Sequence, residues 1–315
     1  MGKSSILNPE FSIPTLKASV VMPVERLGGD AERAIASVLA QEAPFGFELI
    51  VVSAAPLALA ETRLRNVVEP DRNPATRRNR AVSVAAGEFL AFIDDDALAG
   101  PGWLATACAY LEAHPDVLAL GGPDPAPPGS TMAELISDTL LATPWIGSGI
   151  AAHEGRRGVF DLQRPSDIAL VNLFVRRSAF TGFDESIGYI GEDTALLKDL
   201  LTRGRVVYHD GVIVHHRRRA FPGPYLRQRW RYRVKTGKMQ RTNRDPKVTA
   251  FVVAGAIGIL FAPIVALPYA LATLVLGARV TRLPFYWWPV IPFAFAMHHL
   301  TYWMGIVTGM LSSRR

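Results

Sequence analysis

Two patterns of apolar and polar positions divide this chain. Through about residue 216, short apolar runs alternate with segments in which apolar residues recur every three or four positions. Beyond Lys247 the sequence is almost unbroken apolar over residues 248–276 and again over residues 284–310. Short buried strands alternating with amphipathic helices predict an α/β domain with a mostly parallel sheet and helices on both faces. The two long runs predict a C-terminal transmembrane helical hairpin.

The first part contains the elements of a doubly wound sheet. Its apolar runs predict strands at residues 18–22, 47–52, 65–69, 89–93, 117–120, 168–175, 206–208 and 212–214. Its periodic segments predict helices at residues 30–41, 76–86, 104–114 and 194–203, and another within 131–165. Ligands of such sheets bind beyond the carboxyl ends of the strands, so the polar residues at those ends are the candidates for function.

Three consecutive carboxylates, Asp94, Asp95 and Asp96, follow the apolar run 89–93. If the strand conformation persists, Asp94 and Asp96 point to one side and Asp95 to the other. Two carboxylates on one side repel each other unless a cation lies between them, and Mg²⁺ or Mn²⁺ bound together with phosphate oxygens suits such a pair. The alternative is an acidic helix N-terminus. The preceding strand favours the metal site.

A second acidic pair, Glu192-Asp193, stands before the helix expected at 194–203. The pair either caps that helix or supplies a general base, which must be an ionised carboxylate within reach of a hydroxyl group. His215 follows the last expected strand and is either structural or a third ligand of the ion. Asn172 lies within an apolar strand.

The positive charge of the chain is local. Residues 217–247 hold twelve lysines and arginines and one acid, Asp245, a net +11, which leaves −5 for the rest of a chain whose total is +6. The single cysteine, Cys108, excludes an internal disulfide and fits a reducing compartment. Residues 1–17 lack the apolar core of a signal peptide.

Either long apolar run is long enough to cross a bilayer, which takes about 20 residues. The aromatic residues 285–288, beside Arg279 and Arg282, resemble an interfacial belt. Two spans would leave the α/β domain and the C-terminal tail on one face, and the basic segment 217–247 predicts that this face is cytoplasmic. A buried hairpin of a soluble protein and a re-entrant first run, which Pro263 and Pro268 interrupt, are the alternatives.

Several motifs of the first part resemble glycosyltransferase family 2. They are residues 18–24, 37–41, 78–79, 86–96, 182–185 and 191–193, and the likeness extends over residues 18–235. Residues 121–123 and the apolar tail look most like the membrane-anchored bacterial exopolysaccharide (succinoglycan-type) glycosyltransferases. The resemblance implies a GT-A (Rossmann-like) fold, a nucleotide-sugar donor, a divalent metal, and inversion at the anomeric carbon.

The resemblance also implies roles for single residues. Asp94 would contact the nucleoside and ribose, Asp96 and His215 would hold the metal, Asp193 would be the catalytic base, and Glu192 would position the base or the acceptor. The residues assigned to the nucleotide sugar are Pro23, Val24, Glu25, Ser53, Arg78, Asp94 and Asp95. Those assigned to the acceptor or a phosphate are Asn172, Arg229 and Trp230.

The chain departs from the family pattern at three places. Ser53-Ala54 stands where the family usually has an Asp that grips the base, and Val24-Glu25-Arg26 stands where it usually has a Tyr-Asn pair. Leu226 stands at the Gln of the QxxRW motif of processive relatives, although Arg229-Trp230 are present, so polymerisation is not expected.

The alternation of arginines with aromatic residues over 227–233 indicates a solvated linker, a nucleic-acid surface, or a contact with lipid headgroups or a polyprenyl-phosphate acceptor. Its place before an apolar run favours the lipid and excludes nucleic acid from the expected partners. The expected layout is a tail (1–17), the catalytic domain (18–216), a basic juxtamembrane segment (217–247), two membrane helices (248–311) and a basic tail (312–315).

The function predicted is transfer of a sugar from a nucleotide sugar to a lipid-linked or polysaccharide acceptor, by an inverting, metal-dependent, multi-pass enzyme of the cell membrane whose catalytic domain is cytoplasmic. The alternative is a catalytically silent membrane scaffold, suggested by the missing base-gripping Asp.

Overall fold

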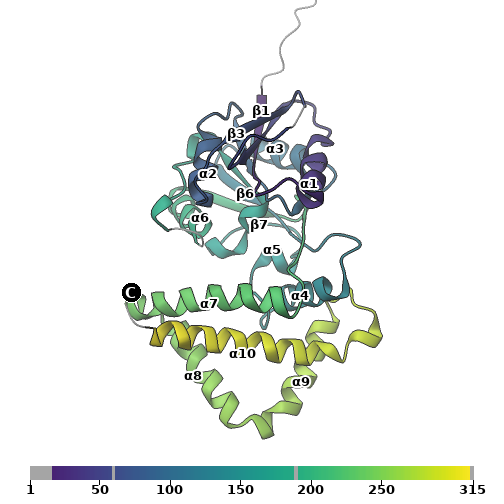
Figure 1. Cartoon of the computed structure of the whole chain (residues 1–315), viewed down its shortest axis with the longest axis vertical. Coiled ribbons are helices and arrows are strands. Elements are labelled where there is room, and N and C mark those ends of the chain that lie inside the picture. Colours follow the sequence, from purple (N-terminus) through teal and green to yellow (C-terminus); the bar gives the residue numbers. More distant parts are fainter. Residues whose placement is uncertain (1–15, 59–60, 188–190, 313–315) are drawn as a thin grey trace, which may run out of the picture.

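The computed structural model describes residues 16–58, 61–187 and 191–312. Most of the expected N-terminal tail, residues 188–190 of the turn before Glu192, and residues 313–315 of the basic tail lie outside the described residues. Figure 1 shows two parts, an α/β domain and, beneath it, a layer of long helices. We call the second part the helical layer, residues 223–311.

Among the described residues, eight strands form the central sheet in the order β3-β2-β1-β4-β8-β6-β9-β7. Strands β3, β2, β1 and β4 run parallel, β8 lies antiparallel between β4 and β6, β9 is parallel to β6, and β7 is antiparallel to β9. The sheet is therefore mixed but mostly parallel, as expected: β3, β2, β1, β4, β6 and β9 run in one direction, and β8 and β7 run in the other. The bounds are β1 Leu16–Pro23, β2 Gly46–Ser53, β3 Leu64–Val68, β4 Phe89–Phe92, β6 Val117–Gly121, β7 Val159–Asp161, β8 Leu173–Arg176 and β9 Arg205–His209.

Helices cover both faces of this sheet, which confirms the expected α/β class (Figure 1). Strand alternation separates the two cores: Val20 and Met22 pack on the face covered by α1 and α3, and Val21 packs on the face covered by α2 and α6. The helices of the α/β domain are α1 Gly29–Leu39, α2 Pro74–Val82, α3 Trp103–Ala113, α4 Met132–Ala142, α5 Ala151–Glu154 and α6 Glu192–Arg203.

Two expected strands take another form. Within the apolar run 168–175, a 3-10 turn at Leu170–Asn172 precedes β8, so the strand is shorter than its hydrophobicity suggests. The last expected strand becomes β10 (Val214–His216), which pairs antiparallel with β5 (Ala97–Ala99) in a separate two-stranded sheet. This small sheet adjoins the carboxyl end of β4, where the three aspartates lie.

The helical layer contains α7 Gly223–Asn243, α8 Pro246–Leu260, α9 Ala262–Ala278 and α10 Val290–Leu311. In Figure 1, α7 and α10 lie side by side below the domain, and α8 and α9 form a V beneath them. The first apolar run is thus two helices bent by 112°, while α10, with 22 residues and a mean hydropathy of 1.3, is long and apolar enough to cross a membrane. The transmembrane hairpin stays a prediction.

Glycines allow α7 and α10 to pack closely. A Cβ built at Gly237 of α7 would overlap the carbonyl oxygen of Ile306, and one at Gly309 would overlap the carbonyl oxygen of Val234. Gly305 and Gly309 are four residues apart on α10, a spacing that brings two small residues onto one helix face. Helix α4 completes the contact, since Leu140 lies in one buried cluster with residues of α7 and α10. The helical layer is therefore anchored to the α/β domain.

Candidate active site

A cavity of about 540 Å³ lies where the carboxyl edge of the sheet meets α7. The end of β1, the turn after β4, the start of α6 and the end of β10 supply its polar walls on the domain side. Helix α7 supplies the opposite wall with Tyr225, Gln228, Arg229, Tyr232 and Arg233. The sequence-based expectation that function lies at this edge agrees with the position of the cavity.

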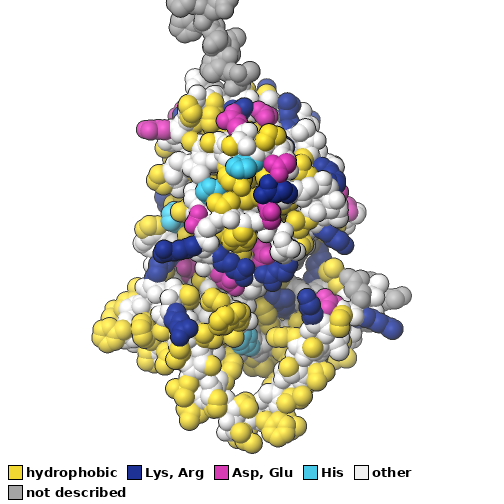
Figure 2. Space-filling model, turned by 180° about the vertical axis from the view of Figure 1, so that it is seen from behind, with side chains coloured by type: hydrophobic (Ala, Val, Ile, Leu, Met, Phe, Trp, Pro, Cys, Tyr) yellow, Lys and Arg dark blue, Asp and Glu magenta, His cyan; other side chains and the backbone are white. Residues whose placement is uncertain are grey.

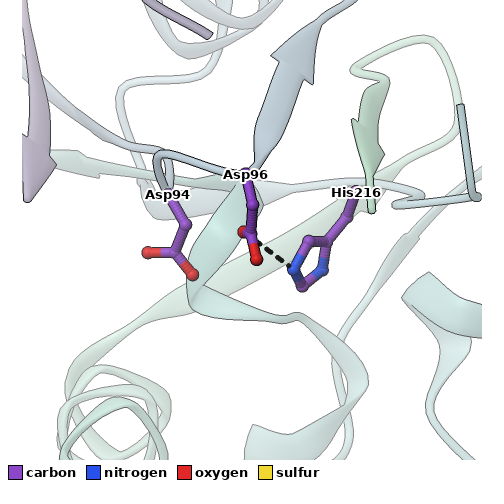
Figure 3. A group of neighbouring side chains, drawn as sticks. All are labelled: Asp94, Asp96 and His216. Carbon is purple, nitrogen blue, oxygen red and sulfur yellow. Dashed lines mark ion pairs between the residues drawn. The ribbon is translucent and has the colours of Figure 1, made fainter. Parts of the chain in front are cut away.

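Asp94, Asp96 and His216 form a cluster with the geometry of a cation site. One ligand atom from each lies within 4.8 Å of the other two, and Figure 3 shows the three side chains converging. Strand β4 ends at Phe92, so the aspartates lie in the turn that leads into β5. Asp95 differs from its neighbours, because one of its carboxylate oxygens accepts a hydrogen bond of 3.2 Å from the Glu25 amide.

The histidine of this cluster is His216 and not the expected His215. In the β5–β10 pairing His216 stands opposite Ala97, and its Nε2 lies 3.3 Å from an Asp96 oxygen. His215 stands opposite Leu98. Successive strand residues point to opposite faces, so only one of the two histidines can face Asp96. The candidate cation cluster therefore contains His216 in place of the expected His215.

Opposing charges set the protonation of this cluster. Burial raises the pKa of Asp96, but hydrogen bonding and charge from His216, together with the charge of Arg219, outweigh it and leave that pKa below its usual value. Burial lowers the pKa of His216, but Asp124 and Asp96 outweigh it and raise it to about 9. Burial raises the pKa of Asp95 to about 6. A cation bound by His216 must therefore displace a proton.

A buried network supports His216 from behind. Asp124, fully buried, has one carboxylate oxygen 3.6 Å from His216 Nδ1, and its other oxygen lies 2.7 Å from His153 Nδ1. Burial raises the pKa of Asp124, but the charge of Arg218 and the interactions with His153 hold that pKa well below its usual range. Arg218 also donates to Asp138, which in turn accepts from Arg282. The network thus runs from the cation cluster to the loop before α10.

The second acidic pair lies at the first turn of α6. Gly191 precedes it with φ 103°, a left-handed conformation that favours glycine. Arg78 donates both to Glu192 (3.1 Å) and to Asp94 (3.0 Å), and so ties the two acidic groups together. Burial raises the pKa of Glu192. The hydrogen bonds that the described residues give the Asp193 carboxylate come from Thr194.

The structure brings most of the predicted site residues to one cavity. Those that line it are Pro23, Glu25, Arg78, Asp94, Asp95, Asp96, Glu192, Asp193 and Arg229. Those that stand outside its described lining are Val24, Ser53, Asn172, His215 and Trp230.

Two of the residues outside the lining have structural roles. The Asn172 amide donates to the Pro123 and Val212 carbonyls and accepts from the Trp103 indole, all within a fully buried environment. This residue joins elements of the core, which corrects its assignment to an acceptor or phosphate. Ser53 is buried, and its hydroxyl donates to the Ala55 carbonyl.

Sequence reasoning missed several cavity residues. Arg77 lies beside the predicted Arg78, is buried, and binds Glu25 (3.0 Å), while its Nη2 is buried and has no hydrogen-bond partner among the described residues. Arg217 and Arg218 fall within the predicted juxtamembrane segment, yet both line the cavity. Their place in the sequence could have indicated this, because both directly follow His216 at the end of a strand.

Comparison with known proteins gives a family match and similar solved structures. Residues 19–148 match the family model described as Glycosyl transferase family 2. No curated protein matches the chain. Among solved structures, the chain is similar to S. aureus TarS 1-349, with 14% identity, 93% of this chain and 90% of that chain covered, and a TM-score of 0.47. The likeness to the succinoglycan-type subgroup stays a prediction. The family match confirms the wider resemblance drawn from the sequence: residues 19–148 are similar to glycosyltransferase family 2, and the chain is a glycosyltransferase.

Proposed function

We propose that this chain is an inverting, metal-dependent glycosyltransferase that moves a sugar from a nucleotide sugar to a lipid-linked or polysaccharide acceptor at the cytoplasmic face of the cell membrane. The observation that carries the proposal is the arrangement of one cavity. Its donor side holds the Asp94, Asp96 and His216 cluster, and the Glu192-Asp193 pair lines the same cavity from the start of another element, α6.

The donor side suits a divalent cation. Two carboxylates and one imidazole are a ligand set for Mn²⁺ or Mg²⁺, and the remaining ligands of such ions are commonly phosphate oxygens and water. Asp96 and His216 would hold the ion, with Asp94 directed to the nucleoside and ribose. A bound cation neutralises the charge that develops on the departing nucleoside diphosphate. Arg77 and Arg219 add positive charge on the same side of the cavity.

The acceptor side requires a base, and Asp193 is the group we assign. It takes the proton from the acceptor hydroxyl as that oxygen forms a bond to the anomeric carbon and the bond from this carbon to the diphosphate breaks. Displacement from the face opposite the leaving group inverts the configuration. Glu192, which accepts a hydrogen bond from Arg78, positions the base or the acceptor and does not itself take the proton.

The cavity wall formed by α7 suits an acceptor that carries a phosphate. The Arg229 guanidinium lies 5.4 Å from the Tyr225 ring centre and 5.2 Å from that of Tyr232. Guanidinium groups bind phosphates through paired hydrogen bonds, and aromatic rings hold the guanidinium plane in place. Because α7 also packs against the apolar helix α10, a lipid chain could remain near the helical layer while its phosphate enters the cavity.

The experiment is a panel of nucleotide sugars added to the purified full-length chain, with Mn²⁺, with Mg²⁺ or with a chelator. Thermal stabilisation reports donor binding, and release of nucleoside diphosphate reports turnover. The proposal expects one donor to stabilise the chain only with metal and to be turned over when a polyprenyl-phosphate or polysaccharide acceptor is supplied. Turnover that is equal with chelator would contradict metal dependence, and no binding of any donor would favour the scaffold.

A further inference from the structure

The loop between α9 and α10 is fastened to the α/β domain. Arg282 in this loop donates to the Ala126 carbonyl (2.8 Å) and to Asp138 (3.0 Å), and the Thr281 and Thr139 hydroxyls are 2.7 Å apart. The segment that separates the two long apolar runs therefore lies on the side of the catalytic domain. A first run that crossed the bilayer once would place this loop on the opposite side.

Helix α10 is bound along α7 and α4. Gly305 and Gly309 lie against α7, and Ile291 and Phe295, near the other end of α10, pack with Leu140 of α4. Helix α7 carries seven lysines and arginines. Each Lys or Arg at the centre of a bilayer costs about 2.5–3.5 kcal/mol. If α10 crossed the membrane with this packing intact, α7 would have to cross with it.

The outward face of α10 is nevertheless apolar. Phe293, Leu300, Met304 and Leu311 are 62%, 47%, 44% and 80% exposed. Their separations of seven, four and seven residues place them within about 40° of one another on a helix with 3.6 residues per turn. The buried residues, such as Phe295 and Tyr302, lie on the opposite face. A helix with one face on protein and an apolar face outward fits a position in the plane of a membrane.

Helices α8 and α9 expose apolar side chains almost all round. Every residue of α8 is at least partly exposed, and near the bend Leu260, Ile264 and Leu267 are 73%, 72% and 69% exposed. No charged residue occurs in 248–278. Soluble proteins rarely leave so large an apolar surface uncovered. Helices α8 and α9 have 15 and 17 residues and are therefore about 22 and 25 Å long. Because the pair is bent by 112°, its depth from the bend to the two free ends is roughly 20 Å, less than the ~30 Å thickness of the hydrocarbon core.

Basic residues border this apolar surface. Arg227, Arg231 and Lys238 are exposed on α7 and lie four and seven residues apart, on the helix face away from the cavity-lining residues. Arg279 is exposed at the end of α9. We call these four residues the basic band. Figure 2 shows Lys and Arg side chains gathered where the domain meets the helical layer, with hydrophobic side chains below them.

We infer that the helical layer docks on one leaflet of an anionic bilayer without crossing it. Helices α8 and α9 dip into the leaflet, α10 lies in its plane, and the basic band meets the headgroups. The inference rests on the membrane location in the proposed function and is independent of its chemistry. Charge complementarity selects the bilayer over a second copy of the chain, since two basic bands would repel each other.

Cysteine labelling tests this topology on the full-length chain in sealed membrane vesicles of both orientations. In a Cys108→Ala background, single cysteines are placed in the α/β domain (Thr62→Cys), in the α9–α10 loop (Arg279→Cys) and at the bend (Leu260→Cys). A membrane-impermeant maleimide should label the first two from the same side. The third should react only after detergent is added.

Labelling of Arg279→Cys and Thr62→Cys from opposite sides would establish a span and overturn the inference. Labelling of Leu260→Cys without detergent, from either side, would also overturn it, because the bend would then lie in water. Donor turnover measured on the same membranes keeps the two proposals apart, since either topology is compatible with active enzyme.

Vesicle flotation tests the charge of the docking surface. The purified chain is mixed with vesicles of phosphatidylcholine alone or with 30% phosphatidylglycerol added. Arg227→Gln and Arg231→Gln should each weaken partitioning onto the anionic vesicles by about fivefold at low salt. Arg80→Gln, an equal charge change on an exposed residue of α2, is the control and should have no effect. Equal flotation of all three variants, or a chain that stays in solution as an oligomer with both vesicle types, would overturn the inference.

Discussion

The α/β domain and the helical layer are both rich in apolar residues, but they place them differently. In β1, Val20, Val21 and Met22 are all fully buried, divided between two cores by strand alternation. In α8, an equally apolar sequence is exposed along its whole length. Hydropathy alone does not separate these cases. The difference shows that the burial of an apolar segment depends on tertiary contacts, such as that of Arg282 with Asp138 after α9, and not on its hydropathy alone.

Substitutions in the two regions should therefore affect different properties of the chain. The largest effect, on sugar transfer, should come from a substitution in the α/β domain and leave membrane binding unchanged. Asp96→Asn removes a charge from the cation cluster, so we expect a loss of transfer by about 10²–10³-fold, the size of effect seen when one preorganised electrostatic group is removed. Vesicle flotation should be unchanged. Asp116→Asn, at an exposed pair with Arg205, is the control. Normal turnover by Asp96→Asn at all Mn²⁺ concentrations would refute the assignment of the cluster.

Asp124→Asn tests the network behind His216. Outer-shell partners of metal ligands commonly account for 10–100-fold in metal affinity, so the Mn²⁺ concentration for half-maximal turnover should rise by about that factor. Excess Mn²⁺ should restore most of the rate, which loss of folding would not allow. A variant with an unchanged Mn²⁺ requirement would show that Asp124 serves the core alone.

Gly237→Val tests the helical layer. Its side chain would overlap the Ile306 carbonyl, so α7 and α10 must separate, at a cost of about 1–3 kcal/mol in the free energy of unfolding. Gly258→Val in α8 is the matched control, because a Cβ at Gly258 meets open space. Thermal unfolding in detergent measures both. A Gly237→Val chain as stable as the control would mean that the two helices are not packed as described.

Arg282→Gln tests the connection between the regions and should have the smallest effect. It removes hydrogen bonds to Asp138 and Ala126 from a half-exposed side chain, worth about 1 kcal/mol. Arg203→Gln is the control, since Arg203 likewise donates to a carboxylate and a backbone carbonyl, those of Asp199 and Ala179. Hydrogen exchange should rise in the α9–α10 loop for Arg282→Gln only. Equal exchange in both variants would show that the connection is not needed to hold the loop.

Much of the fold could be predicted from the sequence because its signals are local. The buried strand β4 is a continuous apolar run, β2 is one interrupted by Glu48, and the carboxylates that follow β4 lie at the edge where ligands of such sheets bind. The family motifs indicated Asp94, Asp96 and Asp193, and all three line the cavity. Each of these features could be predicted from the local sequence around it.

The failures concern information that is not local. The choice between His215 and His216 depends on the register of the β5–β10 pair, and a shift of one residue reverses it. The core role of Asn172 depends on Trp103, Pro123 and Val212, which are distant in sequence. The bend at Phe261 and the return of Arg282 to the domain depend on tertiary contacts that a hydropathy window does not contain.

The most direct test of the central claim, that one cavity binds the donor with Asp94, Asp96 and His216 and activates the acceptor with Asp193, is calorimetry and transfer measured together on Asp193→Asn. Asp199→Asn, on the same helix and away from the cavity, is the control. Asp193→Asn should bind the nucleotide sugar and Mn²⁺ as the unaltered chain does and lose transfer by about 10²–10⁴-fold. Transfer at the normal rate, or loss of donor binding in a folded Asp193→Asn chain, would contradict this division between the two sides of the cavity.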